Sequence, residues 1–139
     1  MESNIYQNKT IAYLIKEATR YFNAYIRKRD SENNFFKCIS CSKFKKINLL
    51  QAGHYLNAKQ NPAVRFDERN VNGQCIDCNC HLEGNVDNYR KKLIEKIGLD
   101  QVEGLEALNN YYKKIPFKWC KIDLIEVIEK YKSKLKDFD

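Results

Sequence analysis

The sequence predicts a single α+β domain in which a small, zinc-stapled centre is flanked by helices at its N- and C-terminal sides. Two observations carry this prediction. Apolar residues recur at helical spacing in both end segments, and four cysteines form two Cys-x2-Cys pairs between them. A chain of 139 residues suits one core. We therefore expect one domain over residues 1–139, with a helix in 1–32, the zinc centre in 33–84 and further helices in 85–139.

The first segment predicts an amphipathic helix from about Thr10 to Arg29. Its apolar residues follow one another at steps of four and three, so they share one helical face. They are Ile11, Ile15, Ala18, Phe22 and Tyr25.

Three helices are predicted after the centre. The first runs from about Val86 to Ile97, and Gly98 follows it where a helix C-terminus favours glycine. Asp100 and Glu103 have the spacing of a capping box, which predicts the start of a short second helix. A terminal helix is predicted from apolar positions that recur at steps of four and three, namely Leu124, Ile128, Tyr131, Leu135 and Phe138.

The segment from residue 33 to residue 70 lacks helical periodicity. Gly53 and Pro62 interrupt it, and its apolar residues come in brief runs that suit short strands. These residues are Phe35, Phe36, Phe44, Ile47, Leu49, Leu50, Val64 and Phe66.

The two Cys-x2-Cys pairs predict a structural zinc site, because four thiolates complete the tetrahedral shell of Zn²⁺. The expected ligands are Cys38, Cys41, Cys75 and Cys78. The alternatives are four unrelated buried cysteines or a redox pair. Cys80 lies close enough to Cys78 to compete as a ligand, whereas Cys120 is left over.

The charge of the chain favours a polyanionic partner. The formal net charge is +7, and residues 37–69 carry seven basic side chains against two acidic ones. We predict DNA contacts there and along the next helix, and the alternative is a solvated charged surface. The expected contact residues are Lys43, Lys45, Lys46, Lys59, Arg65, Arg69, Arg90 and Lys91.

No apolar run is long enough to cross a membrane and the first residues lack an export signal, so we expect a cytoplasmic protein with no membrane partner.

Three polar residues around the second cysteine pair could cleave a phosphodiester bond. The neutral imidazole of His54 could activate water at neutral pH. Asn79, directly after Cys78, could offer an oxygen to Mg²⁺ or Mn²⁺, and Asn70 could orient His54 or its loop. The alternatives are a core or zinc-binding role for His54 and a helix N-cap for Asn79.

The order of His54, Asn70 and Asn79 resembles that of the zinc-containing HNH, or ββα-metal, endonucleases. The resemblance implies a ββα-metal centre with a treble-clef zinc site, a histidine base and a catalytic metal ion. Many HNH nucleases have an Asp or His ligand where this chain has Gly53. The residues that could replace that ligand are Gln51, Asp67, His81 and Glu83, and Glu83 would share a helical face with Asn79.

A more specific resemblance covers nearly the whole chain. It rests on the segments NAYIRKRD, CISC, AGHY, VRFDERNVNGQC, CNCHLEGN, YRKKLIEKIG and YKSKLKD, which are similar to the NinG, or Rap, family of phage recombination proteins. The resemblance implies a phage-encoded endonuclease that cuts Holliday junctions and other branched DNA in the cytoplasm of the bacterial host. Some members of this family have Asp where this chain has Gln51.

We therefore expect a Mg²⁺-dependent endonuclease for branched DNA. The alternatives are a zinc-stapled module that binds DNA without cutting it and an HNH nuclease for linear duplex DNA. Because a four-way junction is close to two-fold symmetric, we also expect a homodimer formed mainly through the terminal helices. In the alternative, the apolar faces of the terminal helices pack within one chain and the protein is a monomer.

Overall fold

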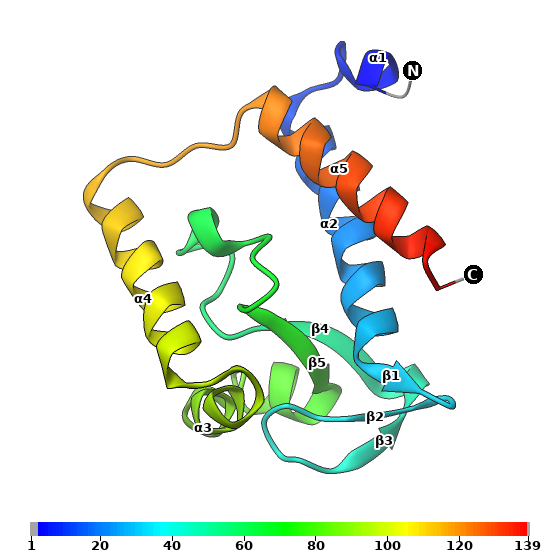
Figure 1. Cartoon of the computed structure of the whole chain (residues 1–139), viewed down its shortest axis with the longest axis vertical. Helices are drawn as coiled ribbons and strands as arrows, with labels where there is room; N and C mark the ends of the chain where they lie inside the picture. Colours follow the sequence, from blue (N-terminus) through cyan, green and yellow to red (C-terminus); the bar gives the residue numbers. More distant parts are fainter. Residues whose placement is uncertain (1–2, 139) are drawn as a thin grey trace.

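The computed structural model describes residues 3–138 and shows a mixed α+β fold. Two helix pairs lie on opposite sides of a central β-hairpin (Figure 1). The order of the elements is α1 (Ser3–Tyr6), α2 (Ile11–Arg29), β1 (Ser31–Glu32), β2 (Phe35–Lys37), β3 (Phe44–Lys46), η1 (Ile47–Leu49), β4 (Leu50–His54), η2 (Pro62–Val64), β5 (Val71–Cys75), η3 (Asp77–His81), α3 (Val86–Ile97), α4 (Leu99–Lys114) and α5 (Lys121–Lys136). None of the helices within this range is long and apolar enough to cross a membrane.

Helices α2 and α5 lie side by side and bury their apolar faces against each other (Figure 1). The rings of Phe22 and Tyr131 meet edge to face at 4.8 Å between centroids. The expected α2 stripe is shifted, because Leu14 and Ile26 are fully buried while Ile11 is exposed. Since the two terminal stripes pack within one chain, a homodimer would need other surfaces, and it stays a prediction.

The predicted start and end of α2 are confirmed. Thr10 is its N-cap, and the Thr10 hydroxyl accepts a hydrogen bond from the Tyr13 N–H at 3.1 Å. The predicted end of α3 at Gly98 is also confirmed, and Gly98 has a φ of +92°. The capping box is wrong, because α4 starts directly after Gly98 and already contains Asp100 in its first turn.

The strands form two small antiparallel sheets, β1-β2-β3 and the hairpin β4-β5. The hairpin pairs His54 with Val71 and Leu50 with Cys75. Four apolar residues expected in strands lie elsewhere, and two of them, Ile47 and Leu49, form the ends of the 3₁₀ helix η1. Val64 is in the 3₁₀ turn η2, which begins at Pro62, and Phe66 is in the loop before β5, where its ring packs against Phe22 of α2.

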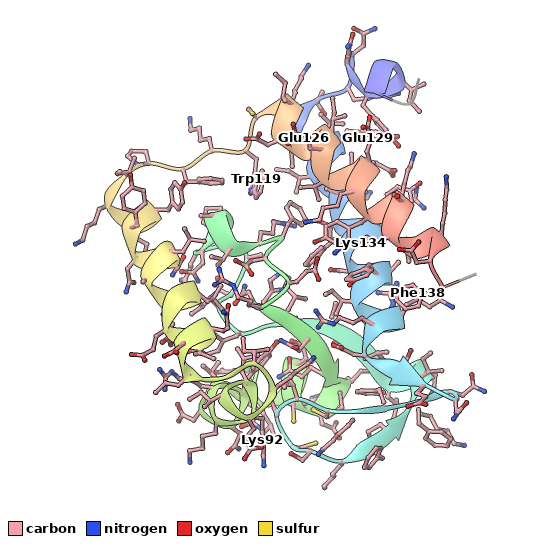
Figure 2. All side chains as sticks on the ribbon, viewed as in Figure 1. Lys92, Trp119, Glu126, Glu129, Lys134 and Phe138 are labelled. Carbon is pink, nitrogen blue, oxygen red and sulfur yellow. The ribbon has the colours of Figure 1, made fainter. Side chains whose placement is uncertain are left out.

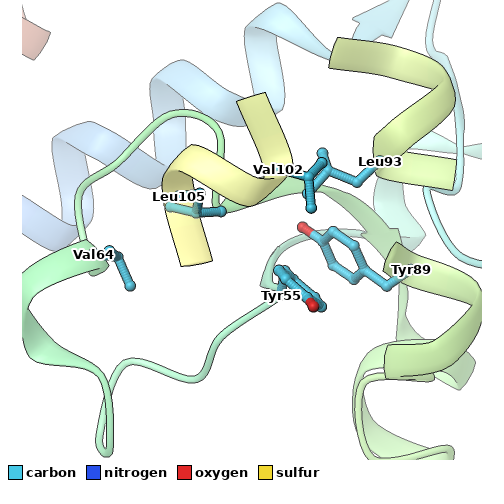
Figure 3. Packing of buried hydrophobic residues seen from close by; sticks show 6 residues of the cluster. All are labelled: Tyr55, Val64, Tyr89, Leu93, Val102 and Leu105. Atoms are coloured by element: carbon cyan, nitrogen blue, oxygen red, sulfur yellow. The ribbon is translucent and has the colours of Figure 1, made fainter. Parts of the chain in front are cut away.

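The remaining core joins the hairpin loop to α3 and α4. Its buried residues are Tyr55, Val64, Tyr89, Leu93, Val102 and Leu105 (Figure 3). The connection from α4 to α5 is fixed by Trp119, which points toward the η2 segment (Figure 2) and donates from its indole nitrogen to the Pro62 carbonyl at 2.9 Å. Together these contacts hold the loop between β4 and β5 against the helices.

Candidate functional site

The four predicted zinc ligands come together between β2 and the end of β5. The sulfur atoms of Cys38, Cys41, Cys75 and Cys78 all lie within 4.8 Å of one another. Four sulfurs around zinc are expected about 3.8 Å apart, given Zn–S bonds of about 2.3 Å. The residues thus fit a closed, structural zinc site, with Cys78 rather than Cys80 as the fourth ligand.

The surroundings of the cysteines also suit a bound cation. Burial raises the pKa of the Cys78 thiol to about 12, so a thiolate there requires a positive charge beside it. Two donors already point at the sulfurs. The Cys75 N–H lies 3.3 Å from the Cys38 sulfur, and the Asn85 amide lies 3.5 Å from the Cys78 sulfur. Cys80 and Cys120 are exposed and lie outside the cluster.

His54 is the last residue of β4, and one contact defines its protonation. Its Nε2 lies 3.1 Å from the Arg65 carbonyl oxygen. A carbonyl can only accept, so Nε2 carries a proton, and in the neutral ring Nδ1 keeps the free lone pair. Burial of the ring lowers the pKa of His54 below 6.5, and the nearby Arg65 charge acts in the same direction. The imidazole is therefore neutral at pH 7.

Asn70 is buried and holds the loop that follows His54. The Asn70 amide donates to the Leu56 and Val64 carbonyls at 2.9 and 3.2 Å, and its oxygen accepts from the Leu56 N–H at 2.8 Å. The Asn70 side chain thus fixes the backbone between the strands rather than touching the imidazole.

Asn79 lies in η3, a π-helical turn, beside the side chain of Gln51. The Asn79 amide donates to the Gln51 oxygen at 2.7 Å. The thiol of Cys80 approaches the same oxygen at 3.4 Å. Gln51 is one of the four residues considered as replacements for the missing ligand, and it is the one that Asn79 contacts. His54 has a different partner, the Arg65 carbonyl.

The other three residues considered for that role have different surroundings. The helical face expected to join Asn79 and Glu83 does not exist, because η3 ends at His81 and Glu83 has a φ of +50°. His81 is exposed. The Asp67 carboxylate forms an ion pair with Arg69 at 2.8 Å.

Gly53 has a structural reason to lack a side chain. A Cβ atom there would lie 2.8 Å from Cβ of Gln74, whose side chain fills the space beside Gly53. Gln74 is fully buried and donates to the Ser40 hydroxyl and the Gly84 carbonyl at 2.8 and 2.6 Å. The ligand that HNH nucleases carry at this position would therefore clash with Gln74.

Comparison with known proteins decides the family. The family model described as "Bacteriophage Lambda NinG protein" matches residues 3–139. This chain belongs to the NinG family. It is 38% identical to "Protein ninG" of Escherichia phage 933W, 37% to that of Salmonella phage P22 and 36% to that of Escherichia phage lambda, each over 129 residues and 93% of this chain. The aligned part covers 60%, 59% and 59% of those proteins, so this chain spans about three fifths of their length. No solved structure matches it significantly.

Two supports of the site in this NinG protein were not predicted from the sequence. The buried Tyr89 hydroxyl donates to the Gly53 carbonyl at 2.6 Å, directly beside His54. At the end of α2, Asp30 accepts from the Gly73 N–H at 2.7 Å, and Arg29 donates to the Val71 carbonyl at 2.8 Å. The adjacent opposite charges of Arg29 and Asp30 at a helix end were the available signal for the second support.

The eight basic residues predicted to contact DNA fall into two groups. Three arginines have partners within the protein: Arg65 donates to Thr19, Arg69 pairs with Asp67 and Arg90 pairs with Glu106. The lysines are more accessible. Lys43, Lys46, Lys59 and Lys91 are exposed, and Lys45 is half-buried. Among these eight residues the accessible positive charge is therefore carried by lysines, and three of them lie in β3 or directly before it.

Proposed function

We propose that this NinG protein is a metal-dependent endonuclease with an HNH-like, ββα-metal centre, and that it cuts branched DNA. One observation carries the proposal, namely the contact between His54 Nε2 and the Arg65 carbonyl. It leaves Nδ1 as an unprotonated nitrogen on a ring held in one orientation. A general base needs this combination of fixed geometry and a free lone pair.

The environment of His54 supports its role as the base. The pKa of His54 lies below 6.5 because the ring is buried, so the lone pair is available over the whole neutral range. Asn70 and Tyr89 hold the backbone on either side of His54. His54 can therefore take a proton from water that attacks a phosphodiester placed beside the end of β4.

Asn79 and Gln51 are the residues we assign to Mg²⁺ or Mn²⁺. These ions prefer oxygen ligands, and the 2.7 Å contact brings the two side-chain amides to one place. Such an ion offsets the charge that develops on the scissile phosphate and its leaving oxygen. Gln51 is a neutral ligand, so we expect weaker metal binding than Asp would give at this position.

The substrate class follows from the exposed lysines and from the resemblance to the NinG family. Lysine side chains bind phosphates without reading sequence, which suits a nuclease that recognises DNA shape. A junction cut in two strands requires two active sites, so a homodimer remains part of the proposal.

The test compares cleavage of a four-way junction and a matched linear duplex, with and without Mg²⁺ or Mn²⁺. We expect junction cleavage that depends on the metal, and we expect His54→Ala to lower the rate at least about 100-fold. Junction affinity should stay within about threefold, because the imidazole acts on water. The rate should fall only below pH 6.5, where His54 becomes protonated.

The matched control is His81→Ala, since His81 is the other histidine and is exposed. It should cut like the wild type. Junction binding without cleavage by the wild-type protein would favour a non-cleaving DNA-binding module. Equal cutting of linear duplex would contradict selectivity for branches, and a fully active His54→Ala variant would contradict the assignment of the base.

A further inference from the structure

We infer that the outer face of strands β2 and β3 binds unpaired bases of DNA at a branch point. This inference rests on the proposed function. It concerns a surface of the β2–β3 pair, which is distinct from the β4-β5 hairpin. We call this surface the outer hairpin face, and it is formed by Phe35, Lys37, Phe44 and Lys46. It identifies what the protein would recognise in branched DNA that linear duplex lacks.

The strand register places these four residues together. Phe35 pairs with Lys46, and Lys37 pairs with Phe44. Directly opposed residues of an antiparallel pair share a face, and so do residues two apart on one strand. The two rings therefore lie on one diagonal of this surface and the two ammonium groups on the other.

The opposite face of the same strands packs against the cysteine cluster. Phe36 is only 2% exposed and packs with Cys38 and Cys75 of the zinc cluster. In contrast, Phe35 is 47% exposed and Phe44 is 74% exposed. Within residues 3–138, neither of these two rings belongs to a core cluster or contacts another ring. The outer rings thus contribute little to the folded core.

Further exposed apolar residues follow β3 directly along the chain. Ile47 and Leu49 of η1 are 42% and 38% exposed. Lys43, next to Phe44, is also exposed, and Glu32 of β1, which pairs with Phe35, is an exposed acidic residue. Exposed apolar surface bordered by charged groups is typical of an interaction site.

Alternating rings and ammonium groups fit single-stranded DNA better than duplex DNA. Bases stack on aromatic rings while lysines bind the phosphates between them. In a linear duplex the base faces are already stacked and paired. A fork has unpaired bases in its single-stranded arm, so the outer hairpin face would add affinity only where such bases are free.

The test measures binding by fluorescence anisotropy without added Mg²⁺ or Mn²⁺. The two probes are a forked duplex with an unpaired arm and a fully paired duplex of equal length. We expect Phe44→Ala to weaken fork binding about tenfold and to change duplex binding by less than about twofold. Phe44→Tyr should restore fork binding, because it keeps the ring. The matched control is Ile122→Ala, an equally exposed apolar residue at 71% on α5, and it should bind both probes normally.

A lysine variant separates stacking from charge. Lys46→Gln should lower the slope of log affinity against log salt by about 0.7–0.9, whereas Phe44→Ala should leave the slope unchanged. Equal losses on fork and duplex for Phe44→Ala, or no loss on either, would overturn the inference. So would a Phe44→Ala variant that dissociates a dimer in sedimentation while binding the fork normally, because the face would then contact a second copy.

These outcomes are independent of the proposed catalytic site. The binding assay requires neither a catalytic metal nor His54. Normal fork binding by Phe44→Ala, together with loss of cleavage in His54→Ala, would reject the inference and leave the proposed function standing.

Discussion

Between α2 and α5, most of the fully buried side chains are large and apolar, such as Phe22 and Ile128, whereas in the centre the buried neighbours of Phe36 are mainly cysteines. The helices are also long, with 19 residues in α2 and 16 in α5. The strands β1, β2 and β3 have only two or three residues each. The two regions therefore bury very different amounts of apolar surface.

This difference indicates two sources of stability in one chain. Apolar burial and ring contacts stabilise the α2–α5 pair. Strands of three residues cannot stabilise themselves, and a small centre of this kind requires a metal. Since η3 contains Cys78 and Asn79 directly follows that cysteine, we expect the proposed site at Asn79 to depend on the region that holds the cysteine cluster.

The largest expected effect is the loss of zinc. Cys75→Ser should abolish stoichiometric zinc binding and remove amide-exchange protection from β1–β3 and η3, because structural zinc contributes about 10 kcal/mol or more to such sites. Helices α2 and α5 should retain more protection than the centre. Elemental analysis and hydrogen exchange measure both effects.

Cys120→Ser is the control for this experiment, because Cys120 is exposed and outside the cluster. It should keep full zinc content. A Cys75→Ser protein with normal zinc content and normal protection of the centre would contradict the assignment of the ligands.

The second prediction truncates the core of the helix pair. Phe22→Ala removes a fully buried ring that contacts Phe66 and Tyr131, so it should lower the free energy of unfolding by about 3–5 kcal/mol. Zinc content in the folded protein should stay at one ion per chain. Ile11→Ala, at an exposed position of α2, should cost far less in the same denaturant titrations. Loss of zinc from folded Phe22→Ala would show that the two regions are not independent.

The sequence predicted the helices well because their apolar residues recur at a fixed period. The prediction still assigned Ile11 to the buried face instead of Leu14 and Ile26, since several nearby stripes fit the same pattern and the partner helix selects one. The start of α4 was also wrong, because Gly98 ends α3 and directly precedes α4. Local capping rules do not include such a shared residue.

The candidate site was predicted by motif spacing rather than by periodicity. Spacing indicated the four cysteines that the structure brings together, and it placed Asn79 beside the second pair. The contact between Gln51 and Asn79 and the clash between Gly53 and Gln74 depend on the strand register and on the π-helical turn. Neither can be read from residue types. The expected helical face shared by Asn79 and Glu83 was wrong because it assumed an α-helical turn after Asn79, whereas Glu83 as a metal ligand stays a prediction.

Asp30 connects the two regions. It follows α2, accepts from the Gly73 N–H of the hairpin and pairs with Arg29 at 2.8 Å and with Lys96 of α3 at 3.1 Å. Burial opposes ionisation of Asp30, but the hydrogen bonds and charges of Arg29 and Lys96 outweigh it and lower its pKa below 3.8. The ionised carboxylate is therefore the form that stabilises the contact between the end of α2 and the β4-β5 hairpin.

The smallest expected effect comes from Asp30→Asn, which keeps the size of the side chain and removes its charge. It should lower the free energy of unfolding by about 2 kcal/mol at pH 7, because hydrogen bonds to a charged group are lost.

A carboxyl whose pKa is lowered by folding contributes stability above its unfolded pKa and loses it only as the pH falls through the folded value. The difference between wild type and variant should therefore be constant from pH 7 to pH 5, a range in which the exposed control Asp137→Asn should show almost no difference. A difference that shrinks by pH 5 would show that the pKa of Asp30 is raised, and the contact between the helix pair and the hairpin would then require another explanation.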